Sequence, residues 1–79
     1  MTINILAFGI AKDIFGGSAI SIELNGTRIG ELKNMLEEKY PRLKQLASYM
    51  IAVNNEYANN DLVIKQGDEI AIIPPVSGG

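Results

Sequence analysis

One stretch with helical periodicity, set among short alternating segments, limits this chain to few folds. Apolar side chains recur there at spacings of three and four residues: Ile29, Leu32, Leu36, Tyr40 and Leu43. This pattern is typical of an amphipathic helix, here of about 13 residues. Thr27 fits its N-cap, and Pro41 ends or bends it. Lys33 and Glu37, four residues apart, can form an ion pair on its surface.

Short segments on both sides of this helix predict strands. Residues 2–8 and 19–24 alternate with period two, and residues 49–53, 57–58 and 69–73 are set off by turn residues or by the diproline that follows. The first two are joined by a short connection with one helical turn at 10–15, so they should pair antiparallel. Along residues 2–8 the side that faces away from the core begins polar and becomes apolar at Leu6 and Phe8. That side should be solvated at one end and apolar at the other.

The order strand, strand, helix, strand, short strand, strand predicts an α+β fold. We expect a ubiquitin-like β-grasp: a mixed sheet of four or five strands packed against one main helix. Residues 1–73 would form this domain, and residues 74–79 would extend from it as a C-terminal tail that ends in Gly-Gly.

Composition excludes several functions. The 79 residues contain no histidine and no cysteine, so a histidine base, a thiolate nucleophile and the common zinc sites are ruled out, and no metal site is expected. The net charge of -2 argues against nucleic-acid binding. Lys33, Lys39, Arg42 and Lys44 are interpreted as a solvated helix face. No segment reaches the ~20 apolar residues of a membrane span, so a cytoplasmic location is the default.

No residue pattern predicts catalysis by this chain alone. The glycines form neither of the phosphate-binding patterns, and the neighbouring Glu37 and Glu38 do not share one helix face. Met35 and Met50 are interpreted as core residues. The chain is therefore more suited to carrying or binding than to catalysis.

The C-terminal residues Pro74-Pro75-Val76-Ser77-Gly78-Gly79 carry the clearest chemical signal. A diproline favours extended backbone, and from Pro74 onward the tail could reach roughly 20 Å at ~3.3 Å per residue. Two final glycines make a thin peptide that can enter a narrow cleft. The terminal carboxylate becomes a good acyl donor once it is adenylated, and sulfur attack then yields a thiocarboxylate. A tail of small residues can equally be a disordered end.

The run from Gly67 to Ile73, together with the Pro-Pro-Val-Ser-Gly-Gly ending and the order of elements, resembles the small subunit of molybdopterin synthase. Members of that family are ubiquitin-like sulfur carriers. The resemblance covers essentially the whole chain.

The resemblance implies a mechanism and partners. An activating enzyme would use ATP and magnesium to adenylate Gly79, and a persulfide sulfur donor would convert the adenylate to a thiocarboxylate. The chain would dock on the large synthase subunit in a heterotetramer, thread residues 74–79 into its active site, and help convert cyclic pyranopterin monophosphate to molybdopterin. Phe8 and Ile73 match positions of the partner surface. The chain itself would bind no cofactor, and the catalytic side chains would lie on the large subunit.

Three other functions stay open. Sulfur carriers for thiamine or another thio-product also end in Gly-Gly. A protein modifier would be joined to lysines through Gly79. A plain ubiquitin-like interaction domain would make no chemical use of its last residues.

Overall fold

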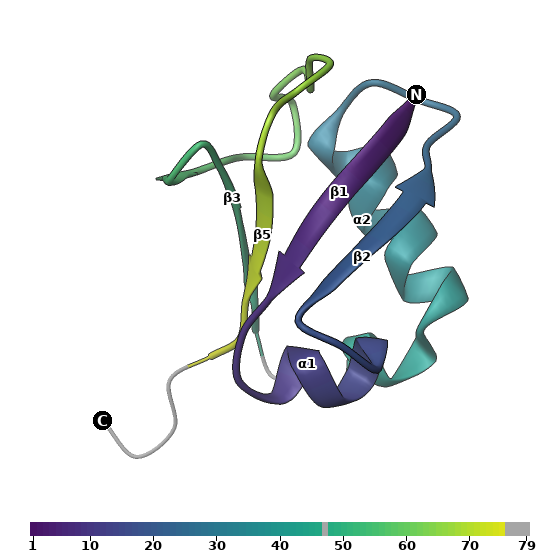
Figure 1. Ribbon diagram of the computed structural model, residues 1–79, viewed down its shortest axis with the longest axis vertical. Helices are drawn as coiled ribbons and strands as arrows, with labels where there is room; N and C mark the ends of the chain where they lie inside the picture. The colour runs from purple at the N-terminus through teal and green to yellow at the C-terminus, as the bar shows by residue number, and fades with distance from the viewer. Residues whose placement is uncertain (47, 76–79) are drawn as a thin grey trace.

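A five-stranded sheet packs one face against helix α2 in the computed structural model, which describes residues 1–46 and 48–75 (Figure 1). The elements in chain order are β1 (Thr2–Ala7), α1 (Ile10–Phe15), β2 (Ala19–Glu23), α2 (Ile29–Lys39), the 3-10 helix η1 (Pro41–Gln45), β3 (Met50–Val53), β4 (Glu56–Tyr57) and β5 (Ile70–Ile73). The predicted elements are thus present, with small shifts at their ends.

The strands lie in the order β2-β1-β5-β3-β4. β1 pairs antiparallel with β2 and parallel with β5, while β3 pairs antiparallel with both β5 and β4. The sheet is therefore mixed, as predicted, and the last strand of the chain lies at its centre. The Asn54-Asn55 turn joins β3 to β4 with both residues at positive φ, 52° and 71°, a conformation that asparagine tolerates better than most residues.

The core lies between the sheet and α2. Its fully buried large side chains come from both layers and from η1: Ile5, Ile29, Leu32, Leu36, Leu43, Ile70 and Ile72. The predicted apolar helix face is thus confirmed as core, although Leu43 lies in η1 because Pro41 ends the α-helix at Lys39. The Tyr40 ring meets Phe15 of α1 edge to face, with ring centroids 4.8 Å apart.

Thr27 is not the helix cap. Arg28 occupies the N-cap position, and a Glu31 carboxylate oxygen accepts hydrogen bonds from the backbone N–H groups of Thr27 and Arg28, both at 3.0 Å. The Thr27 carbonyl accepts the Ile64 N–H at 2.6 Å, so the backbone at Thr27 is tied to the 59–64 loop and the helix begins one residue later.

The predicted ion pair between Lys33 and Glu37 is also wrong, because Tyr49 comes between them. The Tyr49 hydroxyl donates a hydrogen bond to the Glu37 carboxylate, and the Lys33 ammonium lies 5.2 Å from the centre of the Tyr49 ring. Burial, reinforced by the Glu37 carboxylate, raises the pKa of the Tyr49 hydroxyl. This contact fixes the segment that leads into β3 against α2.

None of the helices in the described residues is long and apolar enough to cross a membrane.

Candidate functional site

The face of the sheet that points away from α2 has two unlike ends. Residues alternate between the two faces of a strand, so the buried Ile3, Ile5 and Ala7 of β1 face the core and their neighbours face outward. The outward residues near the start of β1 are polar, and those near its end are apolar. The predicted division of this face is confirmed.

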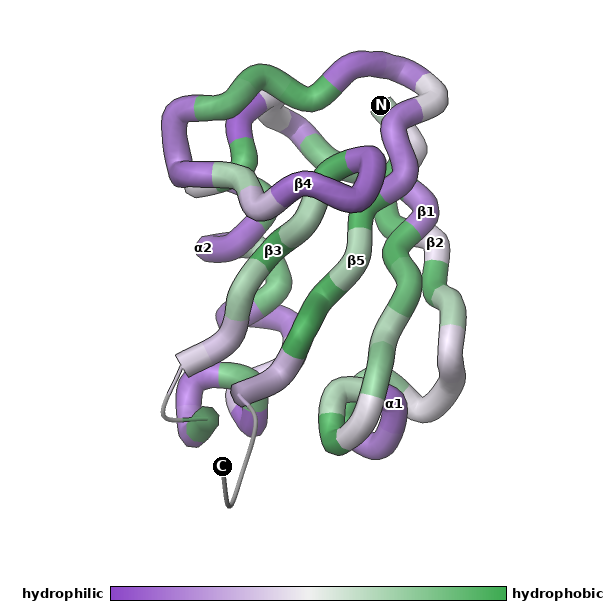
Figure 2. Tube along the Cα trace, turned by 90° about the vertical axis from the view of Figure 1, so that its left-hand side faces the viewer, coloured by the Kyte–Doolittle hydropathy of each residue, from purple (hydrophilic) through white to green (hydrophobic). Residues whose placement is uncertain are grey.

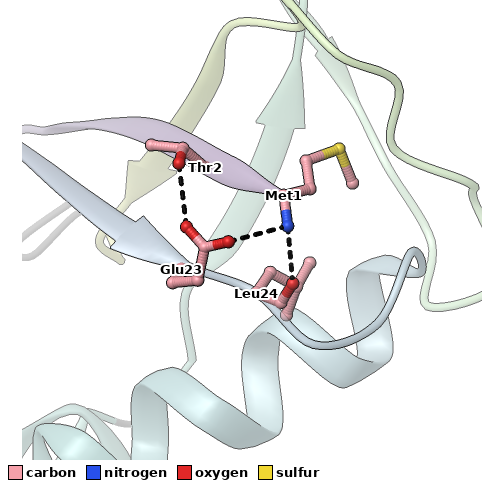
Figure 3. A network of polar contacts seen from close by, with 4 residues as sticks. All are labelled: Met1, Thr2, Glu23 and Leu24. Atoms are coloured by element: carbon pink, nitrogen blue, oxygen red, sulfur yellow. Dashed lines mark hydrogen bonds and ion pairs between the residues drawn. The ribbon is translucent and has the colours of Figure 1, made fainter.

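A hydrogen-bonded network covers the polar end (Figure 3). Glu23 accepts the Thr2 hydroxyl at 2.8 Å and the Met1 ammonium at 3.1 Å, and that ammonium also donates to the Leu24 carbonyl at 3.1 Å. The Thr2 hydroxyl and the nearby ammonium lower the pKa of the Glu23 carboxyl. Beside this network, Ser21 donates to Asn4 at 2.6 Å. The polar groups of this end already have partners within the chain.

The other end of the face carries an apolar outer patch, made of Leu6, Phe8, Met50, Ala71 and Ile73. Strand register brings these residues together, because Leu6 pairs with Ala71 and Met50 pairs with Ile73. Phe8 is 49% exposed and Met50 is 46% exposed, whereas Leu6, Ala71 and Ile73 are half-buried. In Figure 2 the central strands β1 and β5 are mainly hydrophobic, whereas the turn around β4 is hydrophilic.

The tail begins beside this patch. Ile73 is the last residue of β5, and it is followed by the half-buried Pro74 and the exposed Pro75. Gly9, directly after Phe8, has φ 56°, and a Cβ atom built on it would lie 3.1 Å from the Pro74 Cγ. Glycine therefore allows both the turn after β1 and the close approach of Pro74. The predicted tail residues Val76, Ser77, Gly78 and Gly79 lie outside the described residues.

The Gly67-Asp68-Glu69 lead-in holds the start of β5 in place. Asp68 accepts hydrogen bonds from the Lys65 backbone N–H at 2.8 Å and from the Asn54 side-chain amide at 3.1 Å. These two donors, the backbone one first, lower the pKa of the Asp68 carboxyl. The Glu69 N–H donates to the Asn54 side-chain oxygen at 3.0 Å. These residues position the strand that leads to the tail.

The arrangement suits docking. The five patch residues carry no ionisable or nucleophilic side chain, and residues 1–46 and 48–75 contain no group of three metal-ligating side chains. An exposed apolar surface next to a chain end is a feature of protein interaction sites.

Of the two predicted interface residues, Phe8 is exposed and Ile73 is half-buried at the end of β5; their contact with a partner stays a prediction. Sequence reasoning missed Gly9 and placed Met50 wrongly in the core. Its position in the strand could have shown that Met50 faces outward. Met50 directly precedes the buried Ile51, and neighbouring residues of a strand point to opposite faces of the sheet.

Comparison with known proteins gives concordant matches. A model described as the ThiS family matches residues 5–79. The molybdopterin synthase sulfur carrier subunit of Mycobacterium tuberculosis is 36% identical over 98% of this chain and 96% of its own length. A putative molybdopterin converting factor subunit 1 from Pyrococcus furiosus superposes with a TM-score of 0.85 at 26% identity, covering 96% of this chain and 99% of that one. A complex of subunits 1 and 2 of the molybdopterin-converting factor from Helicobacter pylori contains a chain with a TM-score of 0.71 and 30% identity, over the full length of both chains.

Proposed function

The chain belongs to the ThiS family, and on this basis we propose that it is the sulfur carrier subunit of a molybdopterin synthase. Relatives with that name match nearly its whole length. The observation that carries the proposal is the position of the apolar outer patch beside the point where the tail leaves β5. A protein that docks on the patch would receive the end of the tail in its own active site.

The proposed chemistry takes place on the Gly79 carboxylate. In the first step a carboxylate oxygen attacks the α-phosphorus of ATP on the activating enzyme, with magnesium balancing the phosphate charge, and pyrophosphate leaves. In the second step a persulfide sulfur attacks the acyl carbon, and AMP leaves. A thiolate then attacks the donor-side sulfur of the resulting acyl disulfide, so that a new disulfide forms with the donor, the old S–S bond breaks and the thiocarboxylate leaves. Reduced sulfur and ATP are both cytoplasmic resources, so we also propose a cytoplasmic location.

The partner that we propose for the loaded tail is the large synthase subunit, in a heterotetramer. The Helicobacter pylori complex supports a partner of this kind, since it joins subunit 1 to subunit 2. Docking would bury Phe8 and Ile73 of the apolar outer patch against the large subunit. The stiff Pro74-Pro75 pair would direct residues 76–79 into that subunit. The large subunit would supply the acid, base and pterin-binding groups that turn cyclic pyranopterin monophosphate into molybdopterin.

Intact mass spectrometry tests the carrier function. The protein is incubated with its activating enzyme, ATP, magnesium and a persulfide source, and the expected product is heavier by the replacement of one oxygen by sulfur at the C-terminus. An unchanged mass would indicate a plain interaction domain instead of a carrier. Attachment of Gly79 to lysines of other proteins would indicate a protein modifier. If the loaded protein converts the pterin precursor with the large subunit, it serves molybdopterin synthesis. If it instead donates its sulfur only to a thiazole-forming enzyme, it serves thiamine synthesis.

A further inference from the structure

The two edges of the sheet differ in how they are protected. An edge strand exposes unpaired backbone N–H and C=O groups, and proteins usually shield it by keeping it very short or by adding lysine, proline or a bulge. The β4 edge is short, since it consists only of Glu56 and Tyr57. The β2 edge is longer, and its residues Ala19–Glu23 contain no lysine or proline and pair with β1 without a bulge.

The hydrogen-bond pattern shows which groups of β2 face outward. Ser18 accepts the Ala7 N–H at 2.9 Å, and Leu24 donates to the Met1 carbonyl at 2.9 Å. Antiparallel pairs alternate between bonded and non-bonded residues, so Ile20 and Ile22 bond to β1. The N–H and C=O groups of Ala19, Ser21 and Glu23 point away from it, and within residues 1–46 and 48–75 they have no backbone partner outside the strands.

A groove lies where the end of β2 meets α2, which stands behind the sheet in Figure 1. Its volume is about 330 Å³. The described residues that line it are Leu24, Asn25, Gly26, Glu31, Asn34, Met35 and Glu38. Leu24 and Met35 give it an apolar floor, Glu31 and Glu38 make it acidic, and no basic side chain is among them.

We propose that this edge binds an extended, basic segment of a partner protein, which adds to the sheet as a strand beside β2. Its backbone would bond to Ala19, Ser21 and Glu23, and alternate side chains would reach the groove. Charge complementarity favours a basic segment, because a lysine or arginine of the partner would contact Glu38. Apolar side chains of the partner would contact Leu24 and Met35. A second copy of this chain fits poorly, because the strand that it would add, β2 with the sequence AISIE, carries one glutamate and no basic residue. The groove shares no lining residue with the apolar outer patch, although Ala19 at the start of β2 pairs with the patch residue Leu6.

A capped peptide in which serine alternates with valine or arginine serves as the probe, and amide hydrogen exchange with NMR shifts is the readout. The amides of Ala19, Ser21 and Glu23 should gain protection, whereas those of Ile20 and Ile22 are already bonded and should change little. Glu38→Lys should weaken binding about threefold, the size expected for a surface charge contact. The matched variant Glu56→Lys, on the opposite edge, should leave binding unchanged. A peptide with glutamate in place of arginine should bind more weakly than the arginine peptide, by at least the same factor.

Shifts without this alternation, or shifts gathered on Phe8 and Ile73, would overturn the proposal. So would an absence of binding at millimolar peptide. Protection of Ser21 that rises with protein concentration in the absence of peptide would assign the edge to self-association instead. Sulfur loading of Gly79 is measured separately and should be the same in Glu38→Lys, so a failure here is distinguishable from a failure of the carrier function.

Discussion

Replacing Phe8 by aspartate tests the apolar outer patch as the docking surface. Phe8 is 49% exposed, so about half of an aromatic side chain's ~200 Å² remains to be buried by a partner. At ~25 cal/mol per Å², burial of that area contributes about 2.5 kcal/mol to docking, or about 70-fold in the dissociation constant. Aspartate removes this contribution and places a charge in an apolar contact. We therefore expect Phe8→Asp to weaken binding at least about 100-fold.

Titration calorimetry against the large synthase subunit measures this loss. Val63→Asp is the matched control, because Val63 is 47% exposed but lies in the 59–69 loop, away from the patch. It should bind as the unmodified protein does. Thermal unfolding of both variants checks that the fold is intact. An affinity for Phe8→Asp within about twofold of the control, which is less than 0.5 kcal/mol, would remove Phe8 from the interface and refute the area argument.

Three further predictions concern the tail, the core and one turn. Deletion of Gly79 should abolish the sulfur-dependent mass gain and leave the thermal midpoint unchanged, because chain ends contribute little packing; a truncated protein that still loads sulfur would refute the carrier chemistry. Leu36→Ala should destabilise the fold by about 2–5 kcal/mol in urea unfolding, since Leu36 is fully buried, and a loss under 1 kcal/mol would contradict its place in the core. The pKa of the Asp68 carboxyl is lowered in the folded state, so its contribution is present above the unfolded pKa of ~3.9 and is lost as the pH falls through the folded value. Asp68→Asn should therefore be less stable than the unmodified protein at neutral pH, and the gap in urea midpoint should close below about pH 4; a gap independent of pH would argue against the charged contact.

The helix and the strands could be predicted because their signals are local. The spacing of Ile29, Leu32 and Leu36 fixes one helix face, and the alternation along residues 2–8 places Phe8 outward. The strand order and the parallel pairing of β1 with β5 are not local properties, and the residue pattern predicted only a mixed sheet of four or five strands.

The errors arose where a distant segment competes with a local rule. Thr27 has the side chain of a cap, but its carbonyl bonds to Ile64 and Glu31 caps the helix instead. Lys33 and Glu37 have ion-pair spacing, but Tyr49 contacts both. At these positions the local pattern shows which contact a side chain could make with its neighbours in sequence. It cannot show which long-range partner is present.

The parallel pairing of β1 and β5 explains why the apolar outer patch and the start of the tail, Pro74-Pro75, lie at the same end of the sheet. Parallel strands end at the same edge, and the register pairs Ala7 with Ile72, so Phe8, the first residue after β1, follows at the same edge as Ile73, the last residue of β5. Gly9 and Pro74 follow them and approach each other closely. An antiparallel pairing would send the tail from the polar end, where Thr2 and Glu23 are bonded to each other. The sheet topology thus places the apolar outer patch, which we propose as the docking surface, beside Pro74, where the tail begins.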